Sequence, residues 1–186
     1  NIEVARIVHK INPNKKDCAI TTILWKDANL FCGTDKGEVF VYDTSSKVIV
    51  TSVELGETTV IELFALDNDD LIAITEDSRI IFLSLQQSGL TVLSSLEEKD
   101  KQTVSAAFSP SNNCVALGLD DGSVVFFDIK EKVRLFDASC HSDAFTHIGF
   151  IQSKNILVTS SLDNTFKYWD YQLSTLALSI TFEPEK

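Results

Sequence analysis

The sequence predicts an all-β fold assembled from a repeated four-stranded unit, and three observations lead to that prediction. Short runs rich in Val, Ile, Phe, Thr and Leu recur along the 186 residues, separated by Asp, Asn, Gly, Ser and Lys. No stretch shows a helical hydrophobic period over about 11 residues or more. A strand–turn–strand pattern repeats at a nearly constant spacing, as described next. Hydrophobic residues make up 44% and charged residues 23%, which is typical of a globular chain that buries a core.

The repeated segment occurs four times and contains a tight, mostly acidic turn between two strands. Its copies are CGTDKGEVFVYD (32–43), AITEDSRIIFLS (73–84), ALGLDDGSVVFFD (116–128) and TSSLDNTFKYWD (159–170). Each copy ends on Asp or Ser, and the end positions 43, 84, 128 and 170 lie 41, 44 and 42 residues apart. A period of about 40–45 residues with four strands in each repeat is typical of the blades of a β-propeller.

One strand before and one strand after each segment complete the four units. First strands are expected at 20–25, 59–66, 103–108 and 145–151, and last strands at 47–55, 90–96, 133–138 and 176–182. The predicted blades are therefore approximately 20–55, 58–96, 103–139 and 145–183. The inner strands are apolar with little alternation, as expected when neighbouring blades cover both faces of a sheet.

A further predicted strand, IEVARIV at 2–8, remains outside these four blades. We interpret it as the outer strand of a neighbouring blade, so that residues 1–186 form one segment of a propeller. Each blade buries its faces only against its neighbours, so an arc of blades exposes two apolar end faces. Remaining blades, another chain or a second copy would have to cover them.

The stretch CHSDAFTHIGFIQSKNILVTSSLDNTFKYWD (140–170) resembles a WD40 repeat. It has His141 upstream of the first strand, an S-x-D-x-T turn and a closing Trp169-Asp170. The other three repeats are degenerate: Tyr42, Leu83 and Phe127 stand at the Trp position, and none has the upstream His. The resemblance implies a WD40-type β-propeller, a family that mostly uses about seven blades, and we therefore expect these four blades to be part of a larger propeller.

By the same resemblance, His141, Ser161, Asp163 and Trp169 are similar to a buried hydrogen-bonded tetrad with a structural role. Ser161, His141 and Asp163 could also be interpreted as a hydrolase triad, but the sequence has no nucleophile elbow of the G-x-S-x-G type. A buried carboxylate must be paired, and a fully satisfied network makes a blade rigid. We therefore expect no catalytic residue in this chain.

The charge of the chain favours protein partners. The net charge is −11, and a negative protein repels phosphate, so direct nucleic-acid binding is not expected. In this family, the loops that lead into first strands and the turns between second and third strands share one rim, where partners commonly bind. Here these loops and turns carry twelve carboxylates and six lysines, so a basic peptide or protein segment is the expected partner. The candidate partner-binding residues are Asp35, Lys36, Glu76, Asp77, Asp120, Asp121 and Asp143.

The cysteines indicate neither a metal site nor another cofactor. Cys18, Cys32, Cys114 and Cys140 form no C-x-x-C pair, and no His lies at zinc-finger spacing. Two disulfides would fit an even count, but we interpret all four as reduced and mostly buried thiols. No apolar run approaches the roughly 20 residues of a membrane span. These features favour an intracellular protein of the cytoplasm or nucleus with no membrane partner.

The predicted function is a non-catalytic protein–protein interaction scaffold in an intracellular multi-subunit complex. One alternative is the substrate-recognition subunit of a ubiquitin ligase, although such adaptors often carry Arg two residues after the Trp-Asp pair, where this chain has Gln172. The other alternative is a propeller hydrolase, for which the sequence offers no matching motif. A lipid-binding propeller would use an F-R-R-G run, and no Arg-Arg pair occurs here.

Overall fold

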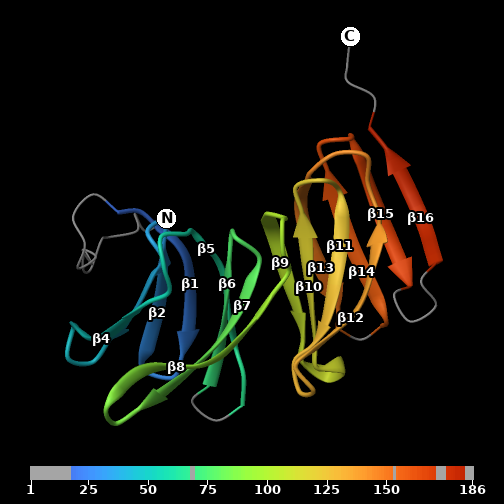
Figure 1. Cartoon of the computed structure of the whole chain (residues 1–186). Coiled ribbons are helices and arrows are strands. Elements are labelled where there is room, and N and C mark those ends of the chain that lie inside the picture. Colours follow the sequence, from blue (N-terminus) through green and yellow to red (C-terminus); the bar gives the residue numbers. More distant parts are fainter. Residues whose placement is uncertain (1–17, 68–69, 153, 171–174, 183–186) are drawn as a thin grey trace, which may run out of the picture.

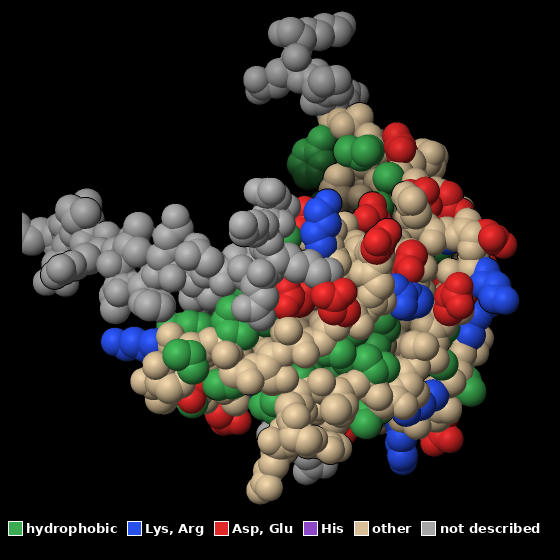
Figure 2. Space-filling model, turned by 60° about the vertical axis from the view of Figure 1, so that its left-hand side comes forward, with side chains coloured by type: hydrophobic (Ala, Val, Ile, Leu, Met, Phe, Trp, Pro, Cys, Tyr) green, Lys and Arg blue, Asp and Glu red, His purple; other side chains and the backbone are tan. Residues whose placement is uncertain are grey.

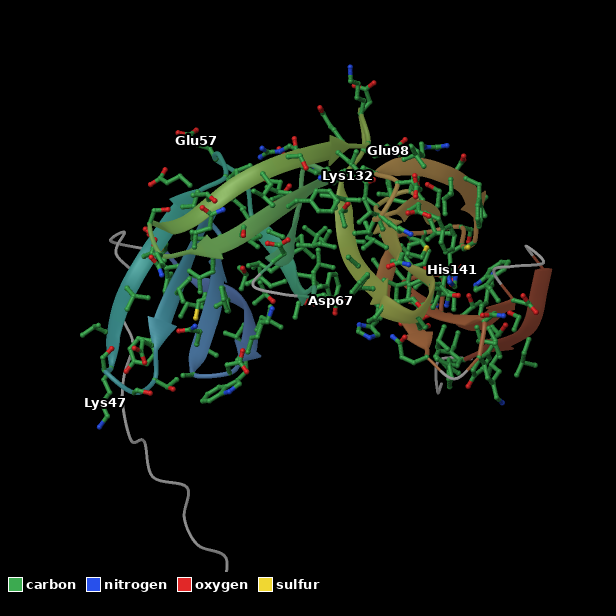
Figure 3. The ribbon with its side chains drawn as sticks, turned by 90° about the horizontal axis from the view of Figure 1, so that it is seen from below. Lys47, Glu57, Asp67, Glu98, Lys132 and His141 are labelled. Carbon is green, nitrogen blue, oxygen red and sulfur yellow. The ribbon has the colours of Figure 1, made fainter. Side chains whose placement is uncertain are left out.

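The computed structural model describes residues 18–67, 70–152, 154–170 and 175–182. Within these residues it has sixteen strands and one short 3-10 turn, Pro110–Asn112. The strands form four antiparallel sheets, each of four strands that are consecutive in the sequence (Figure 1). Seen from below, the sheets follow one another along an arc (Figure 3). The prediction of an all-β propeller with four four-stranded blades is confirmed, whereas the predicted strand at 2–8 lies outside the described residues.

The bounds of the strands are as follows. Blade 1 contains β1 (Ile20–Lys26), β2 (Asn29–Thr34), β3 (Glu38–Asp43) and β4 (Val48–Glu54). Blade 2 contains β5 (Val60–Ala65), β6 (Asp70–Thr75), β7 (Arg79–Gln86) and β8 (Gly89–Glu97). Blade 3 contains β9 (Thr103–Ser109), β10 (Cys114–Leu119), β11 (Ser123–Asp128) and β12 (Val133–Ser139). Blade 4 contains β13 (Phe145–Ile151), β14 (Ile156–Ser161), β15 (Thr165–Asp170) and β16 (Thr175–Thr181).

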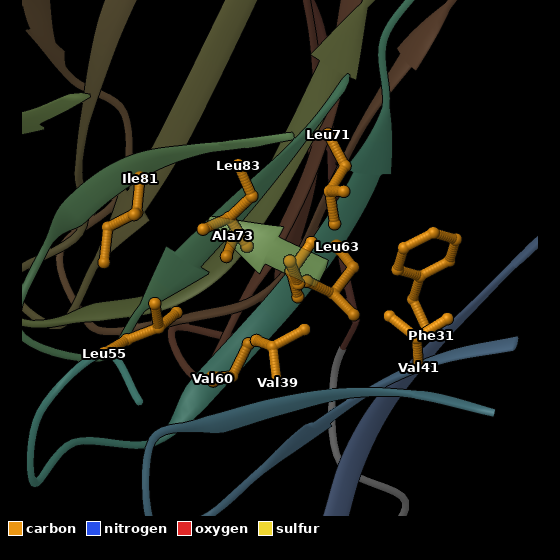
Figure 4. Close-up of a cluster of buried hydrophobic side chains, with 11 residues drawn as sticks. Phe31, Val39, Val41, Leu55, Val60, Leu63, Leu71, Ala73, Ile81 and Leu83 are labelled. Carbon is orange, nitrogen blue, oxygen red and sulfur yellow. The ribbon is translucent and has the colours of Figure 1, made fainter. Parts of the chain in front are cut away.

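Three apolar clusters fill the spaces between neighbouring blades. We call the face of a blade that looks toward the next blade in the chain its forward face, and the opposite face its rear face. Along β7 of blade 2, Ile81 and Leu83 point rearward into the cluster shared with blade 1 (Figure 4). Ile80 and Phe82 point forward into the cluster shared with blade 3. All four side chains are buried, which explains why the third strand of a blade is a continuous apolar run.

The turn between the second and third strands explains the period of the sequence. One residue of each turn, which we call the turn position, has a positive φ: Gly37 (72°), Ser78 (60°), Gly122 (79°) and Asn164 (61°). Glycine adopts this left-handed conformation without steric cost. A Cβ on Gly37 would lie only 1.9 Å from the backbone oxygen of Gly56. Blade 2 uses Ser78 instead, and its buried hydroxyl bonds the backbone oxygen of Lys101 at 2.9 Å.

Repeated backbone hydrogen bonds fix each turn to the loop that leads into the same blade. The residue two before the turn position donates its N–H to the oxygen of a leading-loop residue in all four blades. These bonds are Asp35 to Ala19 (3.0 Å), Glu76 to Thr59 (2.8 Å), Asp120 to Gln102 (3.0 Å) and Leu162 to Ala144 (3.0 Å). Because only backbone atoms take part, the turns and leading loops are held together on one rim whatever their side chains are.

The outward faces of the two end blades both combine buried or partly buried inner strands with exposed apolar side chains. On the rear face of blade 1, Cys32, Phe40 and Tyr42 are buried, but Ile23 and Trp25 on β1 are 63% and 65% exposed. On the forward face of blade 4, Leu178 and Ile180 of β16 are 49% and 40% exposed. The sequence predicted two exposed apolar end faces, and in the described residues both end blades present exposed apolar side chains outward.

Candidate functional site

A chain of hydrogen bonds runs through the interior of blade 4. Trp169 Nε1 donates to Thr159 Oγ1 at 3.0 Å, and Thr159 Oγ1 lies 2.8 Å from His141 Nε2. At the other side of the ring, His141 Nδ1 lies 3.0 Å from Asp163 Oδ2. Because Thr159 accepts from Trp169, its own O–H can donate to Nε2, and the proton of a neutral imidazole then sits on Nδ1 and faces Asp163. Every donor in the chain has an acceptor.

The predicted position of Ser161 in this chain was wrong, because Thr159 provides the bridging hydroxyl. Ser161 Oγ donates instead to the backbone oxygen of Asp143 at 2.9 Å and accepts from Asp163 N at 3.1 Å. Side chains alternate along a strand, so Thr159 and Ser161 both point to the rear face of blade 4. Ser161 ends β14 beside the turn and reaches the leading loop, whereas Thr159 lies deeper, between His141 and Trp169.

The hydrogen bonds around Asp163 determine its charge and that of His141. Oδ1 of Asp163 accepts from Thr165 N at 2.9 Å and from Thr165 Oγ1 at 2.6 Å, and Oδ2 accepts from Ser142 N at 3.1 Å. Burial raises the pKa of the Asp163 carboxyl, but the hydrogen bonds outweigh this effect and hold the pKa well below its usual range. Burial lowers the pKa of His141 below its ordinary value despite the neighbouring carboxylate. The pair is therefore a neutral imidazole beside an ionised carboxylate at neutral pH.

This geometry suits cohesion of the blade and gives no arrangement for acyl transfer. The side chains of His141 and Asp163 are 0% and 8% exposed. A general base needs a free nitrogen within reach of a nucleophile, and both ring nitrogens of His141 are already bonded within the blade. Ser161, the predicted nucleophile of the triad interpretation, bonds backbone groups and neither ring nitrogen.

Blades 3 and 2 carry surface versions of the same acidic contact. In blade 3, Asp121 stands where Asp163 stands in blade 4, and Lys101 Nζ bonds its Oδ2 at 2.5 Å. Burial raises the pKa of Asp121, but hydrogen bonds from Lys101 and Ser123 lower it to about 2. In blade 2, Asp77 pairs with Arg79 Nε at 2.8 Å. A cation thus replaces the missing histidine in both blades, which the sequence analysis did not foresee.

A groove lined mainly by acidic side chains lies on the rim where blades 2 and 3 meet, and we call it the acidic groove. It encloses about 800 Å³. Its walls come from the leading loop and turn of blade 2, the β8–β9 connection and the turn of blade 3. Acidic side chains gather on the upper part of the face drawn in Figure 2. The groove is lined by Glu57, Thr58, Glu76, Asp77, Glu97, Glu98, Asp100, Lys101, Gln102 and Asp120.

Most carboxylates of the acidic groove have no partner within the described part of the chain. Seven carboxylates and one lysine line it, so its charge is strongly negative. Asp77 pairs with Arg79, and Glu98 pairs with Arg134 Nε at 2.9 Å. In the described residues, the remaining acidic side chains make no hydrogen bond or ion pair; they are Glu57, Glu76, Glu97, Asp100 and Asp120. Uncompensated charges concentrated in a groove create a negative potential that attracts cations.

The predicted rim residues divide between this groove and its surroundings. Glu76, Asp77 and Asp120 line the groove, and Asp121 adjoins it through Lys101. The other three lie elsewhere on the rim. Asp35 accepts from Ala19 N at 2.8 Å and lies 4.0 Å from Lys36, whereas Asp143 accepts from Ala144 N at 2.8 Å.

The described residues offer few other groups with chemical reactivity. Burial raises the pKa of Cys32 to about 11 and of Cys114 and Cys140 to about 12, which disfavours their reactive thiolates. No three His, Cys, Asp or Glu side chains in this part of the chain are grouped to hold a metal ion. No helix among these residues is both long enough and apolar enough to cross a membrane.

Comparison with known families gives two matches, which occupy different halves of the chain. Residues 131–170 match the WD domain, G-beta repeat, and include the hydrogen-bonded network of blade 4. Residues 6–95 match the CFAP43 N-terminal domain and include blade 1 and all of blade 2 except the last two residues of β8. The WD domain model thus matches the well-preserved repeat and the other model matches degenerate repeats of blades 1 and 2, whereas most of blade 3 lies between the two matched ranges.

Individual relatives are distant and longer than this chain. A poly(A)+ RNA export protein of Schizosaccharomyces pombe is 29% identical over 66% of the chain, which spans 35% of that relative. A chain in the crystal structure of the mitotic checkpoint complex superposes with a TM-score of 0.78 at 16% identity, over 90% of this chain and 52% of its own length. The structure of U3-55K gives 0.77 at 15% identity, over 90% and 53%. The chain therefore spans about a third of the curated relative and about half of the solved structures.

Proposed function

Because this chain belongs to the WD40-repeat β-propeller family, we propose that it is a non-catalytic protein-interaction scaffold. Its acidic groove binds a segment of a partner protein that is rich in Lys and Arg. The observation that carries this proposal is the concentration of seven carboxylates and a single lysine around one groove of about 800 Å³.

The bonding around the groove supports an interaction that depends on charge. Glu76 N and Asp120 N are fixed to their leading loops, and Thr103 N donates to the oxygen of Glu76 at 2.9 Å. The carboxylates of Glu57, Glu97 and Asp100 remain available on this rigid frame. A preformed site loses little conformational entropy when it binds, and opposite charge raises the rate of encounter.

The interior of blade 4 supports the non-catalytic part of the proposal. His141 and Asp163, the two residues that a hydrolase would use as base and acid, bond only groups of their own blade. They lie in blade 4, whereas the acidic groove is formed by blades 2 and 3. Binding and the hydrogen-bonded network therefore use separate parts of the molecule.

The matched proteins support the class of function and leave the particular role open. One similar protein is described as an RNA export protein, and one similar fold occurs within a mitotic checkpoint complex. Both descriptions fit an intracellular assembly. We therefore place the proposed scaffold inside the cell, with proteins as its partners.

A peptide-binding experiment tests the groove. The double variant Glu76→Lys/Asp120→Lys should bind a fluorescent Lys/Arg-rich peptide about tenfold or more weakly than the unchanged chain at low salt. The loss should shrink as the salt concentration rises, because salt screens exposed charges. Fluorescence anisotropy at two ionic strengths measures both effects.

A matched variant separates the groove from net charge. Glu131→Lys makes the same change of charge as either single variant, Glu76→Lys or Asp120→Lys, but in the exposed β11–β12 turn, at the opposite end of blade 3 from the groove. It should leave affinity nearly unchanged. If the groove variants and Glu131→Lys weaken peptide binding equally, the peptide is attracted by net charge only. If neither kind of variant changes the affinity, the groove is excluded as the binding site.

A further inference from the structure

A second groove lies where blades 2 and 3 meet, on the rim opposite to the acidic groove, and we call it the lower groove. It encloses about 290 Å³. Its lining comes from the β5–β6 and β9–β10 connections, the start of β6, the strands β7 and β8, and the β11–β12 turn. Figure 3 looks onto this rim and labels Asp67 and Lys132, one from each blade. No residue lines both grooves, so the two are separate surfaces.

Four apolar side chains line the lower groove. Phe82 and Ile129 belong to the cluster between blades 2 and 3, and Leu66 packs against that cluster. Leu93 on β8 completes the apolar lining and is 51% exposed. An apolar side chain of a ligand would be covered by these residues on entering the groove. Burial of such a side chain in a pocket is a main source of affinity at protein interfaces.

Charges of opposite sign flank this apolar lining. Asp67 and Asp70 come from blade 2, whereas Lys130 and Lys132 come from blade 3. Within the described ranges, no ion pair joins either carboxylate to either lysine, and the side chains of Asp67, Asp70 and Lys130 make no hydrogen bond. The apolar cluster between the blades keeps the two signs apart. A ligand of a single sign would therefore be attracted by one blade and repelled by the other.

Contacts between the blades fix the positive side of the lower groove. Nζ of Lys132 lies 4.4 Å from the centroid of the Phe82 ring and donates to Ser94 Oγ at 2.7 Å, so this lysine reaches from blade 3 to blade 2. Ile129 N donates to the backbone oxygen of Asn113 at 2.8 Å, which holds the β11–β12 turn in place. A preformed site of this kind loses little conformational entropy when it binds.

We propose that the lower groove binds a segment of a partner protein in which an apolar side chain stands between a basic and an acidic residue. The basic residue lies against Asp67, the apolar side chain contacts Leu93, and the acidic residue lies against Lys130. A segment that is only basic, as expected for the acidic groove, is excluded here by the two lysines. The inference does not rest on the acidic groove, and either proposal can fail while the other stands.

A free amino acid or another small zwitterion is a poorer ligand. Both charges of an amino acid sit on one carbon atom, whereas the lower groove has its apolar lining between the two signs. Its volume of about 290 Å³ is also at the lower end of the range of about 300–1,000 Å³ that is typical of small-molecule sites. Because β8 is the outermost strand of blade 2, an extended chain can leave the groove past the half-exposed Leu93.

Designed peptides test the proposal. The probe is a fluorescent peptide with Leu at its centre, two Arg on one side and two Glu on the other, and with both termini blocked to remove their charges. It is measured in both chain directions. One companion peptide carries Ser in place of Leu, and a second carries Glu on both sides. By fluorescence anisotropy, the probe should bind the unchanged chain about fivefold or more tightly than either companion.

Variants in the lower groove are paired with matched variants outside it. Lys130→Glu should weaken binding of the probe about fivefold, whereas Lys154→Glu makes the same change of charge in the exposed β13–β14 turn and should not. Leu93→Ser should also weaken binding. Leu135→Ser should not, because Leu135 stands at the corresponding bulge of β12, is 48% exposed and lies outside the groove.

A charge reversal on the blade 2 side should change which peptide is preferred. Asp67→Lys should weaken binding of the probe and strengthen binding of the companion with Glu on both sides, each about fivefold. Asp27→Lys makes the same change of charge in the exposed β1–β2 turn and should leave the preference unchanged. A gain of affinity for one peptide cannot arise from damage to the fold.

Three results would overturn the inference. The first is a companion peptide that binds the unchanged chain as tightly as the probe. The second is an equal effect of the groove variants and their matched variants, which would place the probe elsewhere, for example in the acidic groove. The third is the absence of binding of the probe at about 1 mM.

Discussion

Blades 4 and 2 have the same strand order and the same turn, but their interiors differ in chemistry. In blade 4, Thr159 and Trp169 hydrogen-bond at 3.0 Å, five residues before and five after the turn position. In blade 2 the same places hold Ala73 and Leu83, both 0% exposed and part of an apolar cluster. The geometry of a blade therefore does not require the polar network. What it requires is an interior that is either fully apolar or fully hydrogen-bonded.

The two interiors should fail in different ways. An apolar interior tolerates substitutions that keep its volume. A truncation, however, lowers the free energy of unfolding in proportion to the cavity that it leaves. A polar interior loses little volume on a single substitution but leaves buried partners unsatisfied. Three measurements order these effects from the largest to the smallest.

Truncation in blade 2 should have the largest effect. Leu83→Ala removes a completely buried side chain, and the free energy of unfolding should fall by about 3 kcal/mol. Urea unfolding followed by circular dichroism measures this change. Leu135→Ala, at an exposed position, should change it by less than about 0.5 kcal/mol. A loss below about 1 kcal/mol for Leu83→Ala would mean that blade 2 collapses around the cavity.

Removal of the bridging hydroxyl in blade 4 should rank second. Thr159→Val keeps the shape of the side chain but leaves Trp169 Nε1 and His141 Nε2 without partners, so we expect a loss of about 2 kcal/mol. The same urea experiment measures it. Ser161→Ala should cost about half as much, because Ser161 stands outside the chain of side-chain bonds.

A control in the same blade separates burial from loss of a hydroxyl. Thr146→Val removes an exposed hydroxyl that bonds Ser160 at 2.7 Å, and it should be nearly neutral. An equal loss for Thr146→Val and Thr159→Val would contradict the central role of Thr159.

The pH dependence that His141 of blade 4 adds to the stability should be the smallest of the three effects. Folding lowers the pKa of His141, so the unfolded chain takes up the histidine proton first as the pH falls. The contribution of His141 is complete above the ordinary pKa of 6.5 and is lost progressively below it. Asp163, whose pKa is also lowered, adds a further loss below 3.8. Urea unfolding at about pH 7.5 and about pH 5.5 measures the first loss.

The protonation of the His141 imidazole can be measured directly and decides the sign of this pH dependence. NMR titration of His141 should show a neutral ring down to a pH below 6.5. Protonation above that value would mean that attraction to Asp163 outweighs burial, and stability would then rise as the pH falls.

The architecture could be predicted from the sequence because local rules repeat. A residue with positive φ recurs at Gly37, Ser78, Gly122 and Asn164, and the acidic turns around these places gave the period directly. The long apolar runs of the inner strands, such as Ile80 to Leu83, indicated sheets covered on both faces. Even the bounds of first and last strands differ from the predicted ones by no more than one residue.

The details of the site could not be predicted in the same way. Ser161 and Thr159 are both hydroxyl residues on one face of β14, and only the depth of each along the strand decides which one meets His141. The available signal was Thr159, a hydroxyl residue ten positions before Trp169, which lies just outside the S-x-D-x-T motif at 161–165. The contact of Lys101 with Asp121 depends on how the β8–β9 connection folds back, which the strand pattern does not predict. The acidic groove is formed between two blades, so no single repeat contains it.

The backbone bonds that tie each turn to its leading loop have a consequence for how such a protein can change. The N–H donors belong to Asp35, Glu76, Asp120 and Leu162, and the last of these is a 60% exposed apolar residue among three acids. At Asp35 the side chain also bonds Ala19 N, but at Glu76, Asp120 and Leu162 the peptide group alone performs this task. Substitutions at these three positions can therefore change the electrostatic character of the rim with little disturbance to the scaffold beneath. Specificity and stability are thereby uncoupled at these positions, and one architecture can acquire new recognition preferences one side chain at a time.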